Sequence, residues 1–300
     1  MNYRILLPVA FAALLLNCNN ATGQQTDNND AAAATVSSNA SNSVSSDASD
    51  PASDSQSAKD VSASTDAQTA DPSIPALAQR LINAYPEQHL TYNDNYIVFP
   101  DGTKIVFDDG KQKSFEQMLD DCDIEDMLSM KYDTSERIPG YLSDAGRARS
   151  EAFFKKMYGN NEAAVRKNLV KVNWFGQSLL FTKVNGADIQ LKKVADEIAK
   201  HPELRKYMEQ SSSFYWRPVR GAKRLSAHSY GMTIDICTKY SNYWLWSNKG
   251  AGETTKGLKY ENRIPEQIVT IFEKYGFIWG GRWYHYDTMH FEYRPEIAPQ

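Results

Sequence analysis

Two of the five histidines in the chain stand beside acidic residues, within or next to apolar, strand-like stretches. His228 lies in a loop-like Ser-Ala-His-Ser-Tyr-Gly segment, and Asp235 lies near the end of the apolar stretch that follows. His290 comes three residues after Asp287. A catalytic zinc site takes three protein ligands from His and carboxylate groups and keeps a fourth position for water. His228, Asp235 and His290 would supply such a set, and Asp287 would lie beside the open position as general base.

From the residues alone, a structural role for each of these side chains stays open, and their neighbours allow two interpretations each. Glu292 shares one strand face with His290, so it is either a partner of that histidine or a rival to Asp287 as the base, and we favour Asp287. Trp283 either lines a substrate groove or packs against nearby glycines. His285 is expected at the surface or in a groove.

The elements that must position these residues follow from periodicity and turn signals. Helical spacing predicts helices over 76–84, 115–130, 145–157 (with Asp144 as its N-cap), 189–209 (interrupted near Pro202) and 265–276. Strand patterns cover 96–99 and 104–107 around an Asp-Gly turn, 179–184 and 232–236. Helices and antiparallel-looking strands without a βαβ rhythm predict an α+β fold.

Charge and aromatic residues are distributed unevenly along the chain. Residues 19–72 hold eight Asp, one Lys and no aromatic residue, a net charge of −7. Such a composition cannot bury enough apolar surface to fold, so a disordered linker is expected there. From residue 73 onward, 31 Lys and Arg stand against 29 Asp and Glu, which argues against nucleic acid as a partner.

The first 18 residues have the pattern of an export signal. Arg4 precedes an apolar stretch from Ile5 to Leu16, which is typical of a secretory signal peptide. The following Leu-Leu-Asn-Cys resembles a bacterial lipobox, in which Cys18 is lipidated; cleavage after Ala21 is the alternative. We therefore expect a periplasmic or cell-envelope lipoprotein that touches the membrane only through its lipid anchor. Export also permits a disulfide between Cys122 and Cys237, but two cysteines 115 residues apart are not a disulfide framework, so two buried free thiols are favoured and the disulfide is the alternative.

Three motifs, in order, resemble one known family. Residues 226–235 read Ser-x-His-x-x-Gly-x-x-x-Asp, residues 276–283 read Gly-Phe-x-Trp-Gly-Gly-x-Trp, and residues 287–292 read Asp-x-x-His-Phe-Glu. Together they resemble VanY-type D-alanyl-D-alanine carboxypeptidases and L-alanyl-D-glutamate endopeptidases over residues 214–293. That family cleaves peptidoglycan stem peptides with one zinc ion. The resemblance implies the α+β fold of lysostaphin-type peptidases and the hedgehog domain, a central antiparallel sheet with flanking helices and a zinc cleft on the sheet.

The resemblance also implies roles for individual residues. His228, Asp235 and His290 match the ligands of one Zn²⁺ ion, and Asp287 matches the catalytic carboxylate. Arg217 matches the arginine that assists the scissile carbonyl or a substrate carboxylate. Two more arginines, at positions 220 and 224, are close rivals for that role, and the serine at position 226 matches a residue near the bound peptide.

The resulting hypothesis is an exported zinc metallopeptidase that acts on peptidoglycan stem peptides, as a carboxypeptidase or an endopeptidase. Residues 136–300 would form its catalytic domain, and residues 73–135 an N-terminal subdomain or extension. The alternative is a zinc-binding module on the same fold that binds or regulates the cell wall without catalysis. The complete ligand set together with Asp287 favours the enzyme, and the sequence does not indicate an oligomeric state.

Overall fold

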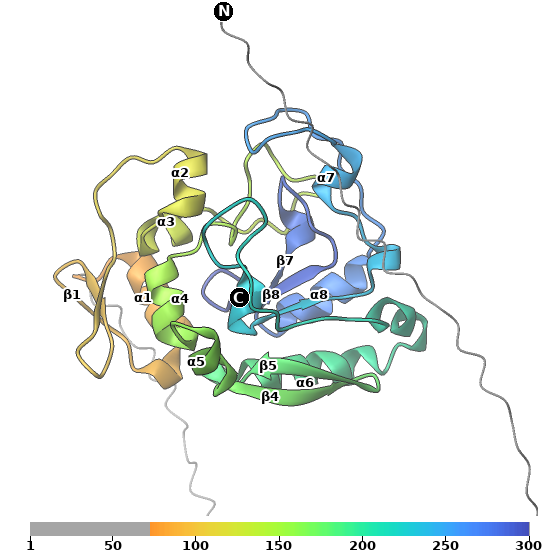
Figure 1. Ribbon diagram of the computed structural model, residues 1–300, viewed down its shortest axis with the longest axis horizontal. Helices are drawn as coiled ribbons and strands as arrows, with labels where there is room; N and C mark the ends of the chain where they lie inside the picture. Colours follow the sequence, from red (N-terminus) through yellow and green to blue (C-terminus); the bar gives the residue numbers. More distant parts are fainter. Residues whose placement is uncertain (1–72, 300) are drawn as a thin grey trace, which may run out of the picture. The chain divides into compact units, whose positions relative to one another are not determined.

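The computed structural model describes residues 73–299 (Figure 1). The signal peptide expected at 1–18, the lipidation site Cys18 and the linker expected at 19–72 lie outside the described residues. None of the helices within the described part has the length and apolar character needed to cross a membrane.

An N-terminal layer combines a helix, a three-stranded meander and two short helices (Figure 1). Its elements are α1 (Ala76–Ala84), β1 (Thr91–Asn93), β2 (Tyr96–Val98), β3 (Lys104–Val106), α2 (Phe115–Asp120) and α3 (Ile124–Ser129). The strands pair antiparallel in the order β1-β2-β3. The predicted first helix and the strand pair around the Asp-Gly turn are therefore confirmed.

The single helix predicted over 115–130 is wrong, because the chain breaks between α2 and α3. Asp123 has extended backbone angles (φ −83°, ψ −167°), and its carboxylate accepts a hydrogen bond of 2.8 Å from the Asp126 amide. The Asp126 carboxylate accepts one of 3.2 Å from the Asp123 amide in return. This capping box begins a new helix even though the apolar spacing continues across it.

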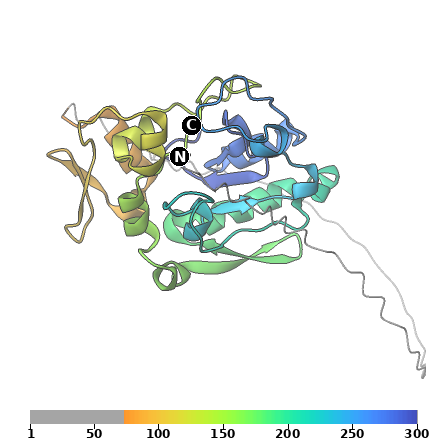
Figure 2. The same cartoon turned by 45° about the horizontal axis from the view of Figure 1, so that its top comes forward.

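The middle of the chain supplies a β-hairpin with helices on either side of it in sequence. The elements are α4 (Glu151–Tyr158), α5 (Glu162–Arg166), β4 (Leu169–Trp174), β5 (Gln177–Thr182) and α6 (Ala187–Ile198). The two strands pair antiparallel, and α6 lies along the hairpin (Figure 2). As expected from Pro202, the long helix predicted over 189–209 is interrupted, and its second half is the 3₁₀ helix η3 (Pro202–Met208).

The helix predicted over 145–157 begins later, at Glu151. Gly146 has a φ of +97°, a left-handed backbone conformation that a helix does not contain. Asp144, expected as the N-cap, instead directs its buried carboxylate to His285. A long-range contact has thus replaced the local capping interaction.

A second three-stranded antiparallel sheet carries two of the three predicted metal ligands. It pairs β6 (Thr233–Asp235), β8 (His290–Tyr293) and β7 (Phe277–Trp279) in the order β6-β8-β7. The short elements around it are η4 (Ala227–Tyr230), η5 (Thr238–Tyr240), α7 (Trp244–Ser247), α8 (Glu266–Lys274) and η6 (Gly280–Arg282). Helices with small antiparallel sheets agree with the expected α+β class.

One hydrophobic core joins the N-terminal layer to the sheet that carries the candidate site. Met127 and Tyr132 belong to the same buried cluster as Tyr230 and Ile278. The Tyr132 hydroxyl also accepts a hydrogen bond of 2.8 Å from the amide of Trp279 in β7. The N-terminal layer therefore supports the strand next to β8.

A second core packs α6 and α8 against the same sheet. Phe272 of α8 stacks on Phe291 of β8, with ring centroids 3.9 Å apart. The central strand is thus fixed by packing as well as by hydrogen bonds to both neighbours. Cys122 and Cys237 are free thiols, so the disulfide alternative is not observed.

Candidate active site

The three predicted metal ligands converge at one end of the second sheet. His228 lies on η4, whereas Asp235 and His290 are directly opposite each other in the β6–β8 pair. Their possible ligand atoms all lie within 4.8 Å of one another. Gly231, with a φ of +67°, turns the chain from η4 into β6, and a Cβ at this position would lie 2.3 Å from Leu169. The glycine of the sequence motif is therefore required by the backbone that presents His228.

The two imidazoles present one nitrogen each to Asp235 and use the other for support. His228 Nδ1 lies 2.7 Å from the carbonyl oxygen of Ser213, and its Nε2 lies 3.2 Å from Asp235 Oδ2. His290 Nδ1 lies 2.9 Å from Asp235 Oδ1, and its Nε2 lies 2.9 Å from Glu292 Oε1. Metal-binding histidines commonly donate their remaining N–H to a carbonyl or carboxylate in this way. Two nitrogens and one carboxylate oxygen therefore fit a three-ligand metal site.

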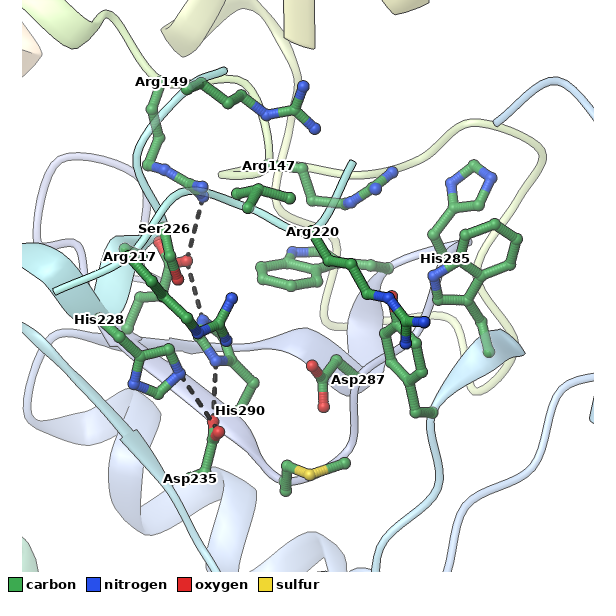
Figure 3. Close-up of a pocket in the computed structure, with 18 of the residues that line it drawn as sticks. Arg147, Arg149, Arg217, Arg220, Ser226, His228, Asp235, His285, Asp287 and His290 are labelled. Carbon is green, nitrogen blue, oxygen red and sulfur yellow. Dashed lines mark hydrogen bonds and ion pairs between the residues drawn. The ribbon is translucent and has the colours of Figure 1, made fainter. Parts of the chain in front are cut away.

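Glu292 connects His290 to buried arginines. Its carboxylate lies 3.2 Å from Arg149 Nη1 and 3.2 Å from Arg294 Nη1. In Figure 3, dashed lines mark the series of hydrogen bonds and ion pairs that runs from Arg149 to His228. Burial alone would raise the pKa of Glu292, but Arg149, His290 and Arg294 lower it to about 2. Glu292 thus stays ionised and bonded to His290, which fits the partner interpretation better than that of a rival base.

The same contacts change the proton affinity of the two facing ligands. Burial would lower the pKa of His290, but its hydrogen bonds to Asp235 and Glu292 raise it to about 10. Burial would raise the pKa of Asp235, but its interactions with His228 and His290 hold that pKa well below the ordinary value. The carboxylates of Asp235 and Glu292 therefore stabilise a positive charge at the position of His290, which lies between them.

Asp287 lines the same cleft without a partner for one of its oxygens. Its Oδ1 is buried and accepts no hydrogen bond from residues 73–299. Burial and the neighbouring charge of Asp235 raise its pKa to about 7. The backbone amide of Asp287 donates to Gly280 (2.9 Å), and the chain around it pairs with Tyr243. A carboxylate that is held in place and titrates near neutral pH can accept and return a proton.

The cleft has a volume of about 670 Å³, and all the metal-binding, catalytic and substrate-binding residues expected from the sequence line it. Arg217 lies exposed at the rim, and Ser226 is buried in the wall. The Trp283 ring lies 5.6 Å from the His290 ring, and its Nε1 donates to the Ala145 carbonyl (2.6 Å). Trp283 is only 5% exposed, so it forms a fixed wall of the cleft.

Two features of the cleft were not predicted. His285, expected at the surface or in a groove, does line the cleft, but it is buried there, and its Nδ1 lies 2.8 Å from Asp144 Oδ2, a partner that was not predicted. Arg149 reaches Glu292 from a loop more than a hundred residues earlier in sequence, and no local spacing pattern connects the two. Only the three-dimensional arrangement could reveal these pairs.

Two acidic clusters in the N-terminal layer have carboxylate spacing similar to that of a metal site. They consist of Asp108, Asp109 and Asp123, and of Asp123, Glu125 and Asp126. Lys113 Nζ lies 3.1 Å from Asp109, 3.2 Å from Asp123 and 2.5 Å from Asp126. An ammonium group of the chain thus already binds three of these five carboxylates.

Residues 220–293 match a family model described as D-alanyl-D-alanine carboxypeptidase. The matched segment contains His228, Asp235, Asp287 and His290, whereas Arg217 precedes it. No curated protein and no solved structure matches the chain. The expected resemblance to VanY-type peptidases is therefore confirmed over residues 220–293.

Proposed function

We propose that the protein is a zinc peptidase that hydrolyses peptide bonds in peptidoglycan stem peptides. The observation that carries the proposal is the convergence of His228, Asp235 and His290 in one cleft with the unpartnered carboxylate of Asp287. The family match supports a peptidase, and the two nitrogens and one oxygen support zinc.

The residues of the cleft would divide the reaction between them. His228, Asp235 and His290 would hold the zinc ion, which when bound would supply Lewis acidity and lower the pKa of a water molecule toward neutral pH. Asp287 accepts a proton from the attacking water and returns it to the leaving amine. Arg217 has no carboxylate partner among the described residues, and its guanidinium would donate hydrogen bonds to the developing oxyanion.

We further propose that the peptidase works outside the inner membrane, in the periplasm or cell envelope. The sequence of residues 1–18 supports export, and Cys18 would carry the lipid that anchors the protein. Residues 19–72 would then form the linker between the anchor and the folded part.

The test combines metal analysis with hydrolysis of purified stem peptides by the full-length protein. We expect about one zinc per chain and cleavage products whose masses identify the bond. His228→Ala should lose both the metal and the activity. Asp287→Asn should keep the metal and lose turnover by about 10²- to 10⁴-fold, the usual contribution of a general base. Bound zinc without cleavage by the unchanged protein would instead favour the non-catalytic module, and the absence of metal would refute the site.

A further inference from the structure

A short hairpin over residues 217–226 forms one rim of the cleft. Pro218 and Leu225 pair across it, and the Ala222 amide donates to the Val219 carbonyl (3.0 Å) to close a turn at the tip. Gly221 has a φ of +81°, which a turn of this kind requires at its third position. The residue before it, Arg220, therefore stands at the tip and lines the cleft.

The base of this hairpin is held on both of its strands. On the first strand, the Arg217 amide donates to the buried Ser229 hydroxyl (3.0 Å), and that hydroxyl donates to the Arg217 carbonyl (2.8 Å). On the second strand, the Arg224 guanidinium binds Asp120 of α2. The tip is thus presented by a backbone that is anchored on each side.

The five arginines that line the cleft differ in their pairing. Arg147 binds Glu253 through two hydrogen bonds, and Arg149 binds Glu292. Arg224 is also paired, with the aspartate of α2. Arg217 reaches only the neighbouring carbonyl of residue 218, and Arg220 is exposed without a hydrogen bond or ion pair to any residue of 73–299. Two guanidinium groups therefore remain free to bind a ligand.

These two groups occupy different parts of the cleft. In Figure 3, the Arg217 guanidinium lies over the triad of His228, Asp235 and His290, whereas that of Arg220 lies on the side of Asp287. A guanidinium group presents a planar fork of N–H donors that matches a carboxylate. Arg217 serves the reacting carbonyl in the proposed mechanism, so the second group is available for another part of the substrate.

We propose that Arg220 binds a carboxylate of the peptide substrate, on the Asp287 side of the cleft, and thereby determines specificity. The cleft would select stem peptides in which this carboxylate is free over those in which it is a carboxamide. This inference rests on the proposed function for the identity of the ligand. It goes beyond that function because it names the residue of the rim that recognises a particular carboxylate of the substrate.

The test measures binding, so that it does not depend on turnover. Full-length protein carrying Asp287→Asn is titrated, in the presence of zinc, with a diaminopimelate-containing pentapeptide. Three variants of the peptide are compared, each with one carboxylate (that of D-glutamate, of diaminopimelate or of the C-terminus) replaced by a carboxamide. We expect one of the carboxamides to weaken binding about tenfold or more, the usual effect of losing a charged hydrogen-bond partner.

In the Asp287→Asn protein, the additional change Arg220→Gln should weaken binding of the parent peptide by the same factor. It should also abolish the difference in affinity between the parent peptide and the carboxamide variant. Arg220→Lys should retain part of it, because the charge remains without the fork. Arg205→Gln, which removes an exposed arginine outside the cleft, is the matched control and should change nothing. Equal binding of all four peptides, binding of none, or discrimination that survives Arg220→Gln would each overturn the proposal.

Hydrolysis of the parent peptide by the protein with Asp287 intact is measured in parallel. Carboxylate-dependent binding without hydrolysis would refute the peptidase and leave the role of Arg220 standing. Hydrolysis without discrimination between the peptides would refute the role of Arg220 alone.

Discussion

Replacing Glu292 by glutamine tests whether this carboxylate holds the site together. Glu292 is 1% exposed and bonds to His290, Arg149 and Arg294. Glutamine keeps the size and one acceptor oxygen, but it leaves two buried guanidinium groups without this negative charge. Removing one partner of a buried ion pair typically costs about 3–5 kcal/mol.

The lowered pKa of Glu292 corresponds to a stabilisation of similar size, because it has the same contacts as its cause. Its value of about 2 in the folded protein, against an ordinary 4.5, corresponds to roughly 3 kcal/mol of stability at pH 7. Because the folded pKa is lowered, this contribution is fully present above pH 4.5 and is lost as the pH falls toward 2. The stability difference between the unchanged protein and Glu292→Gln should therefore narrow, from about 3 kcal/mol at pH 7 to about 2 kcal/mol at pH 3.5.

The assay is urea unfolding of the metal-free, full-length protein at both pH values, with thermal unfolding as a second measurement. At pH 7 we expect the variant to melt about 6–12 °C lower. Zinc affinity, measured by competition with a chelator, should fall about 10- to 100-fold, because His290 loses its charged partner. Glu162→Gln removes an exposed carboxylate that pairs with Arg166 and should change stability by less than about 0.5 kcal/mol. A loss below about 1 kcal/mol for Glu292→Gln, or a loss that does not vary with pH, would refute the reasoning.

Two more predictions concern the N-terminal layer and the loop before α4. Burial raises the pKa of the Cys122 thiol to about 12, so iodoacetamide at pH 8 should label it far more slowly than a free cysteine peptide, and rapid labelling in the folded state would contradict this. Gly146→Ala places a Cβ 2.4 Å from a methyl group of Ile278 at a φ of +97°, so chemical denaturation should show a loss of about 1–3 kcal/mol. Gly102→Ala, also at positive φ but in open space, is the comparison that separates the steric overlap from backbone strain.

Local patterns predicted the site better than they predicted the helices around it. The two-residue period of a strand placed Glu292 and His290 on one face, and the structure joins them by a hydrogen bond of 2.9 Å. The prediction of one helix over 115–130 failed because a capping box at Asp123 begins a new helix there. The spacing of apolar residues carries no information about such a cap.

Long-range polar pairs could not be predicted from one sequence. Asp144 has the residue type and position of an N-cap, and only the fold shows that His285, which follows it by 141 residues, takes its carboxylate. Arg149 is equally distant from the motif that it supports. These pairs form because tertiary packing brings distant residues together, so neither periodicity nor motif spacing can predict them.

The core shared by the N-terminal layer and the β6-β8-β7 sheet has a consequence for how the protein unfolds. The segment that matches the peptidase family covers residues 220–293, yet Tyr132, Met127 and their neighbours fill the space behind it. A fragment that began after this layer would expose their apolar partners and leave the Trp279 amide without its acceptor. Residues 73–299 should therefore melt in one cooperative transition, and the segment that matches the family model belongs to a folding unit about three times its length.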